Sequence, residues 1–151
     1  MRPAHWGAVL GSGVLLCSAC NSNTPERVSA DIESEKLRLT IVRTATDPFL
    51  PRYNLTMTVE GTGGCSSSTE LFPDTGYASR RNIYLAGKGM IYVVGQFDAR
   101  VIDSHSCRTT LSEFRHLDRD VVFIGSFDED RDRHWSYYSA FERSEQPLGS
   151  R

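Results

Sequence analysis

Hydrophobic and polar residues alternate in two stretches of the chain. Residues 37–42 place leucine or isoleucine at every second position, and residues 53–60 alternate Tyr, Leu, Met and Val with polar side chains. A period of two sends one set of side chains to one face of a strand. The pattern predicts two half-buried antiparallel strands, separated by Pro48 and Pro51 and followed by the glycine-rich residues 61–64.

Further runs rich in β-branched and aromatic residues follow, separated by Gly and Asp turns, and each predicts a short strand. They are residues 82–86, 90–97, 100–103, 121–127 and 135–141. Residues 86–90 fit a short hairpin connection. The irregular stretch 65–81 is expected to hold one edge strand near Leu71.

One helix is expected at residues 109–116, where Thr110 and Glu113 can form a capping box. Together these elements predict an all-β fold: a small antiparallel β-sandwich or barrel with one short helix and one disulfide. The length of 151 residues, with 39% hydrophobic and 24% charged residues, fits a single globular domain.

The first twenty residues form a different kind of segment. Arg2 precedes an apolar stretch from about residue 8 to 16, and small residues lead to Cys20. The apolar stretch is shorter than the ~20 residues that cross a bilayer. Residues 1–19 are therefore predicted to be a signal peptide.

Ser18, Ala19 and Cys20 resemble the lipobox of bacterial lipoproteins, although Cys17 stands where that family prefers leucine. The resemblance implies that Cys20 is acylated with palmitate-type chains and becomes the first residue of the mature protein. Asn21, rather than Asp, then implies a lipid anchor in the outer membrane and a domain facing the periplasm. The alternative is ordinary secretion with cleavage after Ala19, which leaves Cys20 as an unpaired thiol.

The polar residues 20–36 are expected to be the lipidated cysteine and a flexible tether, residues 37–143 the domain, and residues 144–151 a disordered tail. The domain keeps two cysteines, Cys65 and Cys107. In an oxidising compartment such a pair usually forms one disulfide, with two separate buried thiols as the alternative.

The densest charge lies in residues 128–134. Asp128, Asp130 and Asp132 alternate like the start of a calcium loop, but Arg133 stands at the sixth position, where such loops need Gly. A solvated hairpin turn with local ion pairs is the preferred interpretation, with calcium or a small ligand as one alternative and a partner-binding loop as another. The predicted binding residues combine charges with aromatic side chains, as interface centres do: Asp128, Asp130, Arg131, Asp132, Arg133, Trp135 and Tyr137.

No catalytic machinery is recognisable. Asp103, Ser104 and His105 are of the residue types found in hydrolase triads, but neighbours on a strand point to opposite faces. A net charge of −2 gives no electrostatic reason to expect nucleic-acid binding. We therefore expect a non-enzymatic lipoprotein without a cofactor, bound to the membrane through its lipid.

A domain of this kind suits a protein-binding role. By resemblance in size and layout to small envelope lipoproteins, the expected roles are inhibitor or immunity protein, or accessory part of a secretion assembly. A purely structural envelope component is the remaining alternative.

Overall fold

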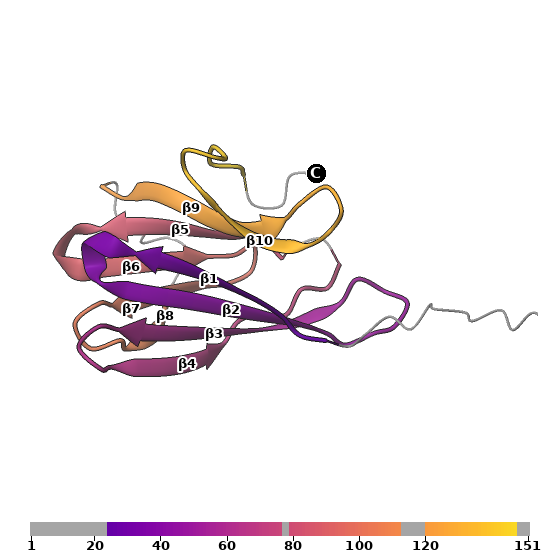
Figure 1. Ribbon diagram of the computed structural model, residues 1–151, viewed down its shortest axis with the longest axis horizontal. Helices are drawn as coiled ribbons and strands as arrows, with labels where there is room; N and C mark the ends of the chain where they lie inside the picture. The colour runs from indigo at the N-terminus through magenta and orange to yellow at the C-terminus, as the bar shows by residue number, and fades with distance from the viewer. Residues whose placement is uncertain (1–23, 77–78, 113–119, 148–151) are drawn as a thin grey trace, which may run out of the picture.

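The computed structural model describes residues 24–76, 79–112 and 120–147, in which ten strands form two antiparallel sheets that face each other (Figure 1). The first sheet contains, in this order, β1 (Glu26–Ile32), β2 (Leu37–Ala45), β3 (Tyr53–Gly61) and β4 (Ser66–Glu70). The second contains, in this order, β10 (Trp135–Ser139), β9 (Val122–Glu129), β5 (Arg81–Ala86), β6 (Met90–Val94), β7 (Ala99–Asp103) and β8 (Thr109–Ser112). The 3-10 turns η1 (Glu33–Glu35) and η2 (Gly87–Gly89) connect β1 to β2 and β5 to β6. The predicted all-β fold is confirmed.

The core lies between the sheets and is built by alternate residues of the facing strands. Leu39 and Ile41 of β2 pack there with Met57 and Val59 of β3, all fully buried. The second sheet contributes Ile83, Ile91, Ile102 and Phe127. The period of two in the sequence thus marks the side chains that leave water.

The two sheets are linked to each other at both edges of the sandwich. At one edge β1 lies beside β10, and the backbone N–H of Trp135 donates to the Glu26 carboxylate (3.2 Å). At the other edge Cys65, just before β4, forms the predicted disulfide with Cys107, before β8 (Cα–Cα 5.7 Å). The two sheets are therefore joined at both sides.

The expected tether is wrong from Glu26 onward, because this part of it is β1. Ala30 and Ile32 are buried, with Val28 packed against the same core, while the residues between them are polar and more exposed. The complete ladder from Glu26↔Arg43 to Ile32↔Leu37 satisfies the backbone. The strand was not predicted because its apolar residues are few and stand between charged and polar ones, so the composition of the segment as a whole is polar.

The expected helix is wrong for residues 109–112, which form β8 and pair with β7. Pairing with a distant strand overrides a local capping signal, and threonine is well suited to a strand. Glu113 and His116 lie outside the described residues. The edge strand expected near Leu71 is β4, which ends one residue earlier, while Leu71 itself is buried.

The expected disordered tail is wrong for residues 145–147, which lie on the second sheet. Asn82 donates to the Gln146 carbonyl (3.1 Å), and the Tyr84 hydroxyl donates to the Glu145 carboxylate (2.7 Å). Burial and this hydrogen bond raise the pKa of Tyr84 to about 12. The sequence shows no apolar pattern here because polar contacts hold the segment.

The expected signal peptide and Cys20 lie outside the described residues. Within residues 24–76, 79–112 and 120–147, no helix is long and apolar enough to cross a membrane.

The disulfide predicts a large change in stability. It closes a loop with a sequence separation of 42 residues, which constrains the unfolded chain by about 4 kcal/mol in the chain-entropy model. We expect Cys65→Ala with Cys107→Ala to lower the free energy of unfolding by about that amount. Urea unfolding of the two proteins measures it, with reductant as the control that makes the wild type resemble the variant. Equal midpoints would show that the bond contributes nothing.

Candidate functional site

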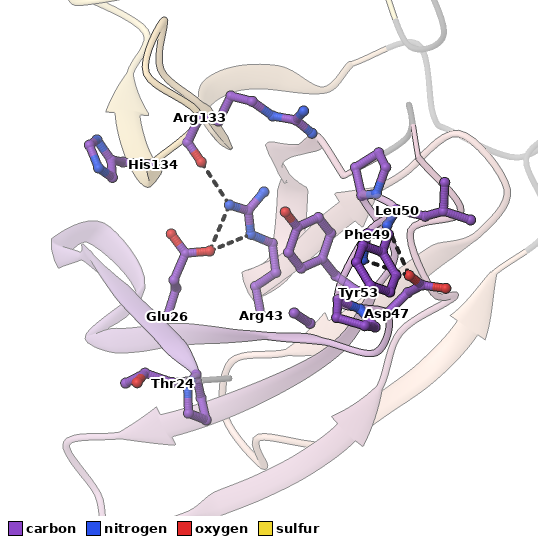
Figure 2. Close-up of a pocket in the computed structure, with 13 residues that line it drawn as sticks. Thr24, Glu26, Arg43, Asp47, Phe49, Leu50, Tyr53, Arg133 and His134 are labelled. Atoms are coloured by element: carbon purple, nitrogen blue, oxygen red, sulfur yellow. Dashed lines mark hydrogen bonds and ion pairs between the residues drawn. The ribbon is translucent and has the colours of Figure 1, made fainter. Parts of the chain in front are cut away.

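A cavity of about 600 Å³ lies at one end of the sandwich. The start of β1, the β2–β3 loop (residues 46–52) and the β9–β10 turn (residues 130–134) meet there. In Figure 2, Glu26 and His134 stand on one side, Phe49 and Leu50 on the other, with Arg43 and Tyr53 between them. Antiparallel pairing brings these segments together, because β2 and β9 end where β1, β3 and β10 begin.

Arg43 forms the floor of the cavity, and its side chain is only 1% exposed. Its guanidinium pairs with the Glu129 carboxylate, pairs with Glu26 (2.6 Å) and donates to the backbone carbonyl of Arg133 (2.9 Å). The same guanidinium lies 4.2 Å from the ring centroid of Tyr53. One buried cation thus joins β1, β2 and β9 to the β9–β10 turn.

The β9–β10 turn is locked by Asp130. One carboxylate oxygen of Asp130 accepts the backbone N–H groups of Asp132 and His134 (2.8 Å each), and the Asp130 N–H donates to the His134 carbonyl (2.9 Å). The His134 N–H does most to hold the pKa of Asp130 below its ordinary value. Arg133 adopts a left-handed backbone (φ 67°). The side chains of residues 131–134 are exposed on a backbone that is already fixed.

Of the predicted binding residues, the structure brings four together at this turn: Asp130, Arg131, Asp132 and Arg133. The other three have internal roles.

Asp128 faces away from the turn and pairs with Arg80 (2.8 Å) and Arg143 (2.7 Å). Trp135 is buried against Phe127, and Tyr137 packs on the same ring. Asp128 and Trp135 are buried, so their side chains are not available at the surface, while Tyr137 is half-buried. Each strand position has a fixed face, which the mixed sequence of this region does not reveal.

The predicted calcium ligands do not converge. Asp128 is occupied by two guanidinium groups, so it cannot join Asp130 and Asp132 around an ion. Ligand atoms of Asp130, Asp132 and His134 instead lie within 4.8 Å of one another. Asp130 uses its carboxylate for the turn, with His134 Nδ1 3.3 Å away. The geometry is that of a hydrogen-bonded turn.

The opposite wall of the cavity is an apolar loop that the sequence analysis did not single out. Asp47 accepts the N–H groups of Phe49 (2.8 Å) and Leu50 (2.9 Å), which hold the pKa of Asp47 below its ordinary value. Phe49 is 92% exposed. The sequence did contain a signal for this exposed loop. Phe49 and Leu50 are large apolar residues between two prolines, outside any alternating pattern that would bury them in a strand.

The Asp103, Ser104 and His105 group lies at the other end of the sandwich. Ser104 Oγ is 3.5 Å from His105 Nδ1, and the Asp103 carboxylate accepts the His105 backbone N–H (2.9 Å). The His105 side chain is 81% exposed. In a relay the acid and the nucleophile contact opposite ring nitrogens of the base, but here the Asp103 carboxylate (3.5 Å) and Ser104 Oγ both lie near His105 Nδ1, so the three residues do not have the geometry of a relay.

The fold and the site together define a small disulfide-bonded β-sandwich domain with a buried arginine beneath a rigid charged turn. The chain matches no protein-family model, no curated protein and no solved structure.

Arg43 gives a direct test of this site. Arg43→Met leaves the buried Glu129 carboxylate with the exposed Arg133 as its cationic neighbour, whose Nε lies 3.7 Å away, and should cost about 3 kcal/mol of stability. Arg43→Met with Glu129→Met removes both charges and should recover much of the loss. Arg38→Met is the matched control, because Arg38 pairs with Asp31 on the exposed face of the same strand (2.7 Å). Urea unfolding should place only the Arg43 single variant far below the others, and equal loss in the two Arg→Met variants would refute this account.

Proposed function

We propose that this protein is a lipoprotein anchored by Cys20 in the outer membrane, and that its β domain binds another envelope protein through the β9–β10 turn. The domain acts by binding, as an inhibitor or immunity protein or as an accessory part of a secretion assembly. The lipobox-like residues 18–20 support the anchor, and the turn supports the binding role.

The rigidity of the turn is the observation that carries the proposal. The Asp130 carboxylate fixes the backbone of the turn, and Arg43 binds the turn from below through the Arg133 carbonyl. A surface that is ordered before binding loses less conformational entropy when a partner docks. The backbone of the turn thus satisfies the buried Arg43, while its side chains stay exposed and available for recognition.

The side chains on the turn match a protein partner in chemistry. Arg131 and Arg133 are exposed, and arginine is enriched at the centres of interfaces. Asp132 lies between the two arginines, so the turn presents charges of alternating sign, and Arg133 Nε also lies 3.7 Å from the Glu129 carboxylate. Alternating charges favour a partner with a complementary pattern over a uniformly charged polymer.

The anchor predicts a change of location. Cells fed labelled palmitate should incorporate it into the wild-type protein and not into Cys20→Ser. The variant should appear in the soluble periplasmic fraction, while Ser18→Ala, the control beside it, should stay with the membrane. Unlabelled wild-type protein in the soluble fraction would refute the anchor.

The binding surface predicts a position-specific cross-link. A photoreactive residue at Arg131 of the full chain should give one discrete adduct in intact envelopes. The same residue at Lys88, an exposed cation on η2 at the other end, is the matched control. In the chain that carries the photoreactive residue at Arg131, Asp132→Arg should lower the yield about ten-fold, since a central interface charge contributes 1–2 kcal/mol or more. Adducts from Lys88 alone, or from neither position, would contradict the proposed surface.

A further inference from the structure

Several large apolar side chains are exposed at the end of the sandwich where the described chain begins. They are Phe49 (92%), Leu50 (49%), Phe72 (45%) and Phe97 (52%). They come from three loops, after β2, β4 and β6, and these strands all end on this side. Figure 1 shows the start of β1 and the β2–β3 loop at this same end.

Contacts between the loops confirm that they are neighbours. An isolated bridge pairs Tyr53 with Asp74, which joins the base of the β2–β3 loop to the β4–β5 loop. The N–H of Phe72 donates to the Asp98 carboxylate (2.9 Å). The rings of Phe72 and Phe97 lie 5.4 Å apart, so this pair packs on itself while staying half exposed.

Hydrogen bonds within the β2–β3 loop fix its backbone, with its tip exposed to solvent. Besides the two bonds from Asp47, the Arg52 N–H donates to the Leu50 carbonyl (2.8 Å) and the Thr46 N–H donates to the Arg52 carbonyl (2.9 Å). These bonds hold Phe49 and Leu50 at the tip. Adjacent apolar side chains held in water on a fixed backbone mark a contact surface.

The position of Thr24 and Pro25, close in sequence to Cys20, indicates what this surface meets. Thr24 and Pro25 line the same cavity as Phe49 and Leu50. Cys20 precedes Thr24 by four residues, and four residues span at most ~14 Å even when fully extended. A lipid on Cys20 therefore brings this end of the domain, and no other, to the bilayer surface.

We propose that the β2–β3 loop docks on the membrane that holds the anchor, with Phe49 and Leu50 entering the interfacial region of the bilayer. This inference rests on the proposed lipid at Cys20. It gives the domain a fixed orientation, with the apolar wall of the cavity against lipid. The turn of residues 130–134 lies on the opposite wall of the cavity (Figure 2).

The contact is apolar in character. Arg52 and Asp47 carry opposite charges beside the tip, so the loop offers no cationic cluster for anionic headgroups. Burial of aromatic and aliphatic side chains at the interface drives the docking, and it should persist in uncharged lipid and at high salt.

The test measures whether the tip touches acyl chains. The mature chain, Cys20 to Arg151, has one thiol outside the disulfide, at Cys20. Coupling this thiol to a maleimide lipid in phosphatidylcholine vesicles supplies an anchor whether or not the cell makes one. Tryptophan emission is then compared in vesicles with and without brominated acyl chains. Trp135, which is buried, gives a constant background.

Two variants form a matched pair. Phe49→Trp places an indole at the loop tip, and Phe141→Trp places one at a side chain that is also fully exposed (103%) but follows β10 at its far end. Both replace one exposed aromatic with another, so the fold is unaffected.

Bromolipid should quench about half of the emission added by Phe49→Trp and leave that of Phe141→Trp unchanged. Quenching of Phe49→Trp that disappears in 1 M salt, or equal quenching of both variants, would overturn the proposal. Absence of quenching in Phe49→Trp would also overturn it. If the Phe49→Trp indole is then shielded from water only in native envelopes, a protein and not lipid covers the loop. Palmitate labelling reports on the anchor separately, so failure of the anchor and failure of the loop contact are distinguishable.

Discussion

The buried Arg43 is the interaction on which the functional end of this molecule depends. A guanidinium removed from water is costly unless it is paired and hydrogen-bonded. Here carboxylates from β1 and β9 and a carbonyl from the β9–β10 turn surround it. These groups come from both sheets, so one cation sets the distance between the sheets at this end. The position of the turn and the existence of the cavity follow from that requirement.

The disulfide has the complementary role at the opposite edge, where it joins the start of β4 to the β7–β8 connection. Both edges are linked between the sheets, and the two ends of the sandwich differ in the loops they carry. One end carries short polar turns, including Ser104 and His105. The other carries the exposed apolar loops, the charged turn and the start of the described chain. This asymmetry connects the proposed anchor, the proposed membrane contact and the proposed binding turn in one orientation.

The strands of the core could be predicted from the sequence because a period of two directly reports which face leaves water. β1 escaped prediction, since Val28, Ala30 and Ile32 are small or scattered among charges. The helix expected at 109–112 failed because pairing with β7 is a long-range choice. Arg43 could not be identified, because its partners Glu26 and Glu129 lie 17 and 86 residues away. The charged turn was found from its composition, but composition could not separate outward residues from inward ones such as Trp135.

Protection of the turn in its native setting tests the central claim most directly. Arginine-specific labelling of Arg131 can be compared between intact envelopes and vesicles that hold only the anchored protein. The exposed Arg108, in the β7–β8 connection at the far end, serves as the internal reference. A bound protein partner predicts that Arg131 is protected in envelopes and labelled in vesicles, while Arg108 is labelled equally in both. Equal labelling of Arg131 in the two settings would contradict the account.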